Sequence, residues 1–361
     1  MAKHDEAVAV AEHRLGEWSE AVGPATKIKK GDRPLWAVAV SGGSDSLALM
    51  HLLAASARAA KIAAPTVLTV DHGLREGSAK DAKKVAAFAK QAGLKAAILS
   101  WRGKKPKAGI EAAAREARYQ LMGAWLTRHR IGTLFVGHTQ DDQAETFLLR
   151  LARGSGLDGL SAMQMRAPWP VQDFPQLTVA RPLLTFRRQE LRDYLTLLGQ
   201  SWLDDPMNQD LAFDRVKIRK ARAALAEAGL STARIAAAAS HLARAREALE
   251  VVTGAVLARA MRPLREGDGV LLESAALAAA PREVGLRALA ALLMAVGGQA
   301  YRPRFESLER LFDRIAGGSL KGGATLHGCQ IGPAPRNFGG PDLLVRPERP
   351  RKTGSSRPKK K

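Results

Sequence analysis

The sequence is poor in cysteine and aromatic residues and has no long apolar run. Cys329 is the only cysteine among 361 residues, which excludes an internal disulfide framework and points to a reducing compartment. Aromatic residues make up 5% of the chain, too few for a surface that stacks many single-stranded bases. No apolar stretch reaches the ~18 residues of a transmembrane helix, and residues 1–12 show no signal-peptide pattern. We therefore expect a cytoplasmic protein with no membrane partner.

Acidic residues are outnumbered by basic ones. The chain has 56 Lys and Arg against 35 Asp and Glu, a formal net charge of +21. Residues 346–361 hold eight Lys and Arg against Glu348 alone, so +7 of the +21 lies there and +14 lies on residues 1–345. A basic body indicates an acidic partner, usually nucleic acid. A solvated basic surface is the simpler alternative.

The first half alternates short β-branched runs with Ala- and Leu-rich helical runs, which is typical of a doubly wound, mostly parallel α/β sheet. Strands are expected at 36–40, 66–70, 95–100 and 133–136, and helices at 46–60, 80–91, 110–128 and 142–153. Ligands of such sheets bind beyond the carboxyl ends of the strands. Three polar segments lie at such ends: Ser41–Ser46, Asp71–Arg75 and Gly137–Asp142.

The second half is expected to form smaller units. Residues 216–315 have helical spacing, residues 322–344 form a glycine-rich β-like stretch, and the Pro/Lys/Arg/Ser-rich end cannot build a core. These features predict the following division: an N-terminal segment (1–33), a catalytic α/β domain (34–214), a smaller helical domain (215–318), a short β-like piece (319–345) and a basic disordered tail (346–361).

The segment Ser41-Gly42-Gly43-Ser44-Asp45-Ser46, called the phosphate loop below, runs from the first strand into a helix. This placement puts backbone N–H groups at a helix N-terminus, where anions bind. The glycines allow close approach of a ligand, and the serine hydroxyls can donate to phosphate oxygens. A carboxylate beside phosphates is repulsive unless a cation lies between them, so Asp45 is predicted to hold Mg²⁺. The alternative is an ordinary turn in which Asp45 is a helix-start charge.

The phosphate loop has no Walker lysine. It resembles instead the loop of the PP-loop ATP pyrophosphatases, which use a Ser-Gly-Gly-x-Asp-Ser signature to cleave ATP between its α and β phosphates. Four further segments, in this order, narrow the resemblance: Val70–Arg75, Glu111–Tyr119, Gly137–Met163 and Asp204–Asn208.

Together these segments resemble the tRNA(Ile)-lysidine synthase family over about residues 35–220. The resemblance implies ATP with Mg²⁺ as cofactor, and L-lysine and the isoleucine tRNA with a CAU anticodon as partners. It implies adenylation at C2 of the wobble cytidine followed by attack of lysine, which yields lysidine, AMP and pyrophosphate. One departure is Val216, which stands where the family usually has Asn after Asp214-Arg215.

Candidate site residues follow from the resemblance and from the residue types. Free lysine has a pKa near ~10.4, so its site must help to deprotonate it. Asp141 and Glu145 are four residues apart on one helix face and are the candidates for this role. The remaining candidates are the phosphate loop, Asp71, His72, Arg75 and Arg115 for ATP; Arg118, His138, Arg153, Arg215 and Arg219 for tRNA; Asp45 as a catalytic residue; and Asp45 with Asp142 for Mg²⁺.

Simpler interpretations remain open for these residues. Asp71 and His72 can belong to a strand-end turn, and the acids of residues 141–145 can be helix-start charges. The Glu111, Arg115 and Arg118 spacing is also that of a solvated ion-pair stripe.

Three rival functions differ from lysidine synthesis in the residues that they need. A tRNA thiolase of the superfamily generally needs paired cysteines, and only Cys329 is present. An amidotransferase needs a glutaminase cysteine, whereas residue 2 is alanine. A basic RNA-binding protein with a degenerate ATP site is disfavoured by the intact phosphate loop.

Overall fold

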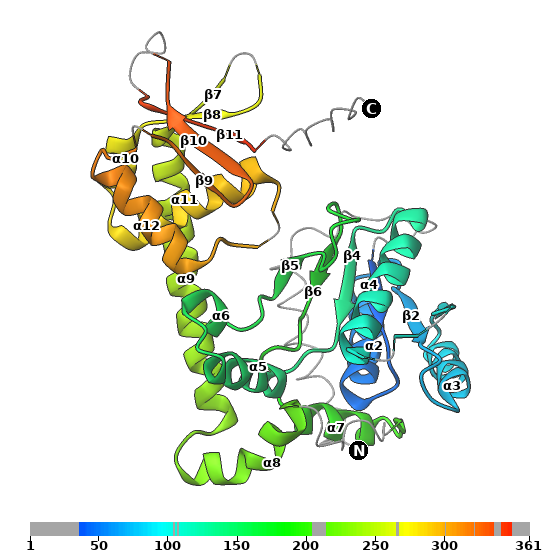
Figure 1. The fold of residues 1–361 in the computed structure, drawn as a ribbon. Helices are drawn as coiled ribbons and strands as arrows, with labels where there is room; N and C mark the ends of the chain where they lie inside the picture. The colour runs from blue at the N-terminus through cyan, green and yellow to red at the C-terminus, as the bar shows by residue number, and fades with distance from the viewer. Residues whose placement is uncertain are drawn as a thin grey trace, which may run out of the picture. The chain divides into compact units, whose positions relative to one another are not determined.

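The computed structural model describes residues 36–103, 105–106, 108–203, 214–264, 267–299, 301–320, 322–335 and 341–348 (Figure 1). The expectations for residues 1–33, for Asp204–Asn208 and for the tail beyond residue 348 lie outside the described residues, as does the side chain of Arg215. Contacts divide the chain into two compact units, residues 1–243 and 244–361. No helix in the described part is long and apolar enough to cross a membrane.

The first unit is built on a six-stranded sheet with the order β3-β2-β1-β4-β6-β5. All neighbouring pairs are parallel except β5 and β6, which pair antiparallel. The predicted mostly parallel α/β sheet is thus confirmed. The strands are β1 (Trp36–Ala39), β2 (Thr66–Asp71), β3 (Ala96–Ser100), β4 (Thr133–Val136), β5 (Arg166–Pro168) and β6 (Thr178–Ala180).

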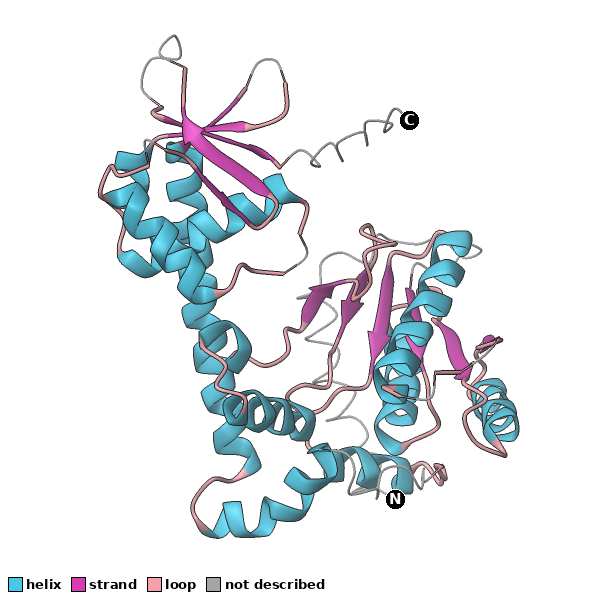
Figure 2. Cartoon of the chain, in the orientation of Figure 1, coloured by secondary structure: helices cyan, strands magenta, loops and turns pink. Residues whose placement is uncertain are grey.

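Helices separate the strands from β1 to β5, and β6 follows β5 directly (Figure 2). The four helices predicted in the first half of the chain are confirmed as α2, α3, α4 and α5, and each of them follows a strand. The helices of the first unit are α2 (Ser44–Ala59), α3 (Ser78–Gln91), α4 (Ile110–His129), α5 (Gln140–Ala152), α6 (Leu157–Leu160), α7 (Arg188–Leu197) and α8 (Asp214–Glu227), and α9 (Thr232–Ala260) begins in it.

Helices cover both faces of the sheet, and successive side chains of a strand point to opposite faces, so neighbouring strand residues belong to different cores. Val38 and Val67 pack with residues of α2, α3 and α7 in one core. Their neighbours Ala37 and Leu68 pack with α4 residues such as Leu126 in a second core. The two cores fix α2 on one face and α4 on the other.

The strand order creates a switch point between β1 and β4. The chain leaves β1 for β2 on one side, and β4 pairs with β1 on the other side. Ligands of open α/β sheets bind at such a point, outside the carboxyl ends of the strands. The phosphate loop follows β1 and the segment from Gly137 follows β4, so both lie at this edge.

The second unit contains a five-stranded antiparallel sheet with the order β7-β8-β11-β10-β9. Helix was expected through residues 216–315, and β7 and β8 fall inside that stretch. Their three-residue lengths leave no periodic pattern to detect. The elements are β7 (Met261–Pro263), β8 (Val270–Leu272), α10 (Ser274–Ala278), α11 (Arg282–Gly297), α12 (Phe305–Ala316), β9 (Ala324–Leu326), β10 (Cys329–Pro333) and β11 (Leu343–Pro347).

Cys329 belongs to the core of this second unit. Its side chain is fully buried among Leu, Ile and Val residues. Burial raises the pKa of its thiol to about 11, so the sole cysteine is a structural residue with little thiolate.

Candidate functional site

The phosphate loop turns sharply from β1 into α2. Gly42 has φ +98°, a backbone conformation that residues with a side chain rarely adopt. A Cβ at this position would lie 2.6 Å from Leu203 Cδ1. The Ser46 hydroxyl accepts from the Ser41 amide at 3.2 Å and donates to the Gly43 carbonyl at 3.0 Å. These two bonds fold the loop back on itself. Among the described residues, no side chain caps the start of α2, which leaves a helix N-terminus suited to an anion.

Gly137, the first residue after β4, packs directly against the phosphate loop. A Cβ at this position would lie 2.9 Å from the Asp45 carbonyl oxygen and 3.0 Å from Ser46 Cα. Both neighbours are backbone atoms, which cannot rotate away. The loop and the end of β4 therefore depend on a glycine for their close contact.

We expect Gly137→Ala to lower the free energy of unfolding by ~1–3 kcal/mol, because the added methyl group forces the loop and β4 apart. Urea unfolding of the full chain measures this effect. Gly132→Ala is the matched control, because a Cβ at Gly132 meets nothing within 4 Å. Equal stability of the two variants would contradict the close packing of β4 on the loop.

Helix α5 begins with a capping box at the same edge of the sheet. The Thr139 amide donates to Asp142 Oδ2 at 2.8 Å, and the Thr139 hydroxyl accepts from the Asp142 amide at 3.4 Å. This reciprocal pair fixes the first turn of α5. The capping box occupies Oδ2 of Asp142 and leaves Oδ1 of the same carboxylate for other partners.

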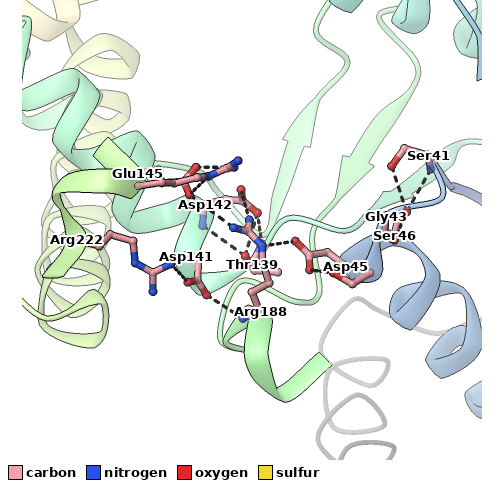
Figure 3. A network of polar contacts seen from close by, with 12 residues as sticks. Ser41, Gly43, Asp45, Ser46, Thr139, Asp141, Asp142, Glu145, Arg188 and Arg222 are labelled. Atoms are coloured by element: carbon pink, nitrogen blue, oxygen red, sulfur yellow. Dashed lines mark hydrogen bonds and ion pairs between the residues drawn. The ribbon is translucent and has the colours of Figure 1, made fainter. Parts of the chain in front are cut away.

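Four buried or half-buried carboxylates meet three guanidinium groups beside this turn (Figure 3). We call this set the acid–arginine cluster; its members are Asp45, Asp141, Asp142, Glu145, Arg188, Arg219 and Arg222. Arg188 lies at its centre. The Arg188 Nε is 2.8 Å from Asp45 Oδ2, one terminal nitrogen is 3.1 Å from Asp142 Oδ1, and the other is 3.7 Å from Glu145 Oε1.

The remaining two arginines come from α8. Arg219 binds Glu145 with two parallel hydrogen bonds of 2.6 and 3.0 Å. Arg222 forms an ion pair of 2.7 Å with Asp141. The two acids expected to act together thus point to different partners, and Figure 3 shows Asp141 turned towards Arg222. The structure instead brings Asp142 and Glu145 to the same guanidinium, that of Arg188.

Burial and charge act in opposite directions on this cluster. Burial raises the pKa of Asp45 above its usual range, although the Arg188 charge opposes it. Burial also acts to raise the pKa of Asp142, but the charges of Arg188 and His138 and the Thr139 hydrogen bonds outweigh it, so that this pKa is lowered. Of Asp45 and Asp142, Asp142 is therefore the more fully ionised.

The residues after β2 form a hydrogen-bonded turn. Asp71 accepts from the Ser78 hydroxyl and, at 3.1 Å, from the Gly73 amide. The His72 ring accepts from the Leu74 amide at 3.1 Å. Arg75 pairs with Asp81 of α3 at 2.6 Å. The simpler interpretation of a structured strand-end turn therefore describes these contacts, and the ATP roles of Asp71, His72 and Arg75 stay predictions.

The other predicted basic residues are spread over the first unit. Arg115 and Arg118 are exposed, with their guanidinium carbons 5.1 and 5.7 Å from the ring centre of the buried Tyr119. His138 accepts from Arg181 Nε at 3.2 Å in one tautomer. Arg153 ends α5 and is exposed. Their proposed contacts with ATP and tRNA stay predictions.

Sequence reasoning missed three arginines of the site, Arg181, Arg188 and Arg222. Arg181 is 7% exposed and binds His138 and the Gln164 carbonyl. Arg188 and Arg222 complete the acid–arginine cluster. The four acids of the cluster were the one feature of the sequence that could have indicated these arginines, because buried carboxylates need cations as partners.

A resident Mg²⁺ does not fit this arrangement. The oxygens of Asp45 and Asp142 that would face each other across a metal both contact Arg188. The described residues also contain no group of three or more His, Cys, Asp or Glu side chains placed to hold a metal ion. The metal roles expected for Asp45 and Asp142 therefore require Arg188 to leave at least one of them.

Comparison with known proteins agrees with the fold and the loop. Residues 20–224 match the model of a PP-loop domain. A U34-tRNA thiolase from Methanococcus maripaludis has a similar fold, with a TM-score of 0.52 at 15% identity over 68% of this chain and 80% of that one.

Curated relatives extend the match beyond this domain. A tRNA(Ile)-lysidine synthase of Ruegeria pomeroyi is 44% identical over 74% of this chain, and the match spans 62% of that relative. One from Wolbachia pipientis wMel is 37% identical over 86% of this chain and 70% of the relative. A third, from Methylobacterium sp. (strain 4-46), is 38% identical over 95% of both chains.

The fold and the loop thus define an ATP-binding domain of the PP-loop class. Within this class, the chain belongs to the tRNA(Ile)-lysidine synthase family.

Proposed function

We propose that the protein is an ATP-dependent carbon–nitrogen ligase that joins L-lysine to C2 of the wobble cytidine in the CAU-anticodon isoleucine tRNA. The observation that carries this proposal is the match to curated lysidine synthases over as much as 95% of the chain. The phosphate loop at the switch point of the sheet supplies a consistent ATP site. A thiolase remains disfavoured because the chain has one cysteine, which is buried.

The proposed reaction has two steps. The cytidine O2 attacks the α-phosphate of ATP, the bond between the α and β phosphates breaks, and pyrophosphate leaves. The lysine ε-amine then attacks C2, and the bond from C2 to O2 breaks as AMP leaves with the oxygen. The phosphate loop would stabilise the charge on the departing pyrophosphate with its amides and serine hydroxyls.

The charge of the acid–arginine cluster supports a site for the lysine ammonium. Within the acid–arginine cluster, as far as the described side chains go, four carboxylates contact three guanidinium groups, so the carboxylates exceed the guanidinium groups by one charge. A single ammonium would neutralise the set, whereas a divalent ion would overcharge it. We assign the lysine to Glu145 and Asp141, with Asp142 as a further acid on the Glu145 side. The cavity between α5 and α8 beside these acids holds about 20 Å³, room for one water, so binding there requires α8 to shift.

The remaining expectations complete the proposal. Asp71, His72, Arg75 and Arg115 would contact ATP, and Arg118, His138, Arg153, Arg215 and Arg219 would contact phosphates or bases of the tRNA. The catalytic role extends over residues 34–214, the cofactor would be ATP with Mg²⁺, and the compartment would be the cytoplasm. Arg219 can serve RNA only by releasing Glu145, to which it is bound at 2.6 Å.

The decisive experiment incubates the full chain with ATP, labelled lysine and an isoleucine tRNA transcript bearing CAU. We expect label in the RNA and one pyrophosphate released per lysine added. A methionine tRNA, which shares the CAU anticodon, serves as the control substrate. Absence of both label and pyrophosphate would favour the alternative of a basic RNA-binding protein with an inactive ATP site.

Binding of tRNA should weaken steeply with salt, because each neutralised phosphate releases counterions and adds roughly −0.7 to −0.9 to the log–log slope. Removal of residues 351–361 takes away six Lys and Arg and no acid, so +15 of the +21 charge remains. The truncation should therefore flatten the slope only in part. Fluorescence anisotropy of labelled tRNA at several salt concentrations measures both slopes.

The cut is placed after residue 350 to preserve the sheet of the second unit. Strand β11 ends at Pro347, and the Glu348 amide donates to the Gly328 carbonyl at 2.7 Å. A truncated protein whose tRNA affinity no longer depends on salt would show that only the tail contacts RNA.

A further inference from the structure

Arg188 is the first residue of α7 and contacts acids from two other helices. Its side chain contacts Asp45 of α2 and Asp142 and Glu145 of α5. Its backbone amide donates to Asp141 Oδ2 at 2.8 Å. One residue thus binds all four carboxylates of the acid–arginine cluster (Figure 3).

The chain around Arg188 is held in place independently of these ion pairs. Phe186, two residues before Arg188, is 3% exposed in the core, and its carbonyl accepts from the Gln140 amide at 2.8 Å. Leu191, one turn further along α7, is 1% exposed. The Arg187 amide donates to Glu190 at 2.6 Å, which caps the helix. The backbone at Arg188 is therefore fixed by contacts other than the ion pairs, and the ion pairs need to order only the side chain.

Neighbouring carboxylates keep the guanidinium of Arg188 in its charged form. Burial disfavours the charged guanidinium, but the carboxylates of Asp45 and Asp142 outweigh this effect and raise the pKa of Arg188. The side chain is 18% exposed, as is that of Asp45. Two acids on separate helices thus share one permanent cation at the switch point of the sheet.

We propose that Arg188 is a built-in cation that closes the space between Asp45 and Asp142 to divalent metal ions in the nucleotide-free protein. A magnesium ion takes carboxylate oxygens at about 2.0–2.1 Å, and it would need the same Oδ2 of Asp45 and Oδ1 of Asp142 that now bind Arg188. Metal and guanidinium exclude each other there. A metal ion can enter only together with a ligand that draws Arg188 away from Asp45, and the anionic phosphates of a nucleotide beside the loop would attract the guanidinium in this way.

The test measures Mn²⁺ binding to the full chain by electron paramagnetic resonance, without ATP, lysine or tRNA. The wild type should show no site that depends on Asp45. Arg188→Gln removes the cation and leaves two carboxylates without it, so this variant should bind Mn²⁺ about tenfold more tightly or better. Adding Asp45→Asn to Arg188→Gln should abolish the gain. Since no substrate is used, the result is independent of whether the chain makes lysidine.

Arg187→Gln is the matched control, because it changes the net charge equally from an adjacent side chain whose ion pair is with Glu190. Arg188→Met, which keeps the apolar stem, repeats the test if Arg188→Gln does not fold, as judged by thermal unfolding. Three outcomes overturn the proposal: a wild-type Mn²⁺ site lost on Asp45→Asn, an equal gain in Arg187→Gln, or no gain in a folded Arg188 variant.

Discussion

Replacement of Asp45 or Ser46 by alanine is expected to reduce ATP-dependent lysine addition by about 10²-fold or more, because the phosphate loop positions charge that develops in the transition state. Ser46 holds the loop closed through its bonds with the Ser41 amide and the Gly43 carbonyl. Asp45 anchors Arg188 beside the loop at 2.8 Å. Its loss leaves a buried guanidinium with one partner fewer at the point where phosphates would bind.

Pyrophosphate release measured with saturating tRNA and lysine tests both variants. Ser56→Ala is a suitable control, because Ser56 lies on the same helix three turns beyond the loop and its hydroxyl is buried without a hydrogen-bond partner in the described structure. A thermal unfolding curve close to that of the wild type separates lost catalysis from lost folding. Wild-type turnover in both Asp45→Ala and Ser46→Ala would refute a role for the loop in ATP cleavage.

The sequence predicts the first part of the fold because its strands and helices carry strong, separate patterns. Strand β4 is found at the predicted Thr133–Val136, and α4 differs from the predicted 110–128 by one residue. Strands β5 and β6 have three residues each and were missed. Such short strands are held by pairing with a neighbour, as β6 is by β4, and the pairing is invisible in a local pattern.

In the site, too, residues that belong to contiguous motifs could be predicted, and contacts between residues far apart in the sequence could not. The loop and the acids of α5 are readable because a signature and a helix start are contiguous in sequence. Arg188 is 143 residues from Asp45 along the chain, and only the packing of α7 on α2 brings them together. Arg219 was predicted to bind tRNA, and its bidentate bond to Glu145 could not be foreseen, because it depends on how α8 packs on α5.

Glu145→Gln should slow lysine addition by very roughly 5- to 150-fold, equivalent to the ~1–3 kcal/mol lost when a buried charged partner is removed. The Glu145 side chain is 3% exposed and lies between Arg219 and Arg188. Glutamine keeps its shape and cancels the one negative charge in balance that we assign to the lysine ammonium. Adenylation and pyrophosphate release without lysine should stay largely intact.

Two assays on one preparation measure these effects: pyrophosphate release in the absence of lysine, and label transfer at increasing lysine concentration. Glu227→Gln, an exposed residue at the end of α8, is the control for the charge change. The assignment of Glu145 to lysine is falsified if Glu145→Gln lowers both activities equally, since that pattern would place the residue on ATP.

Asp141→Asn separates the two acids that the sequence groups together. Asp141 is bound to Arg222 at 2.7 Å and accepts from the Arg188 amide at 2.8 Å. If it also receives lysine, its variant should raise the lysine requirement as Glu145→Gln does. If it only anchors α7 and α8, the variant should lower the unfolding temperature and leave the lysine requirement unchanged. The second outcome would leave Glu145 and Asp142, the two α5 acids that share Arg188, as the side chains that select a monovalent amine.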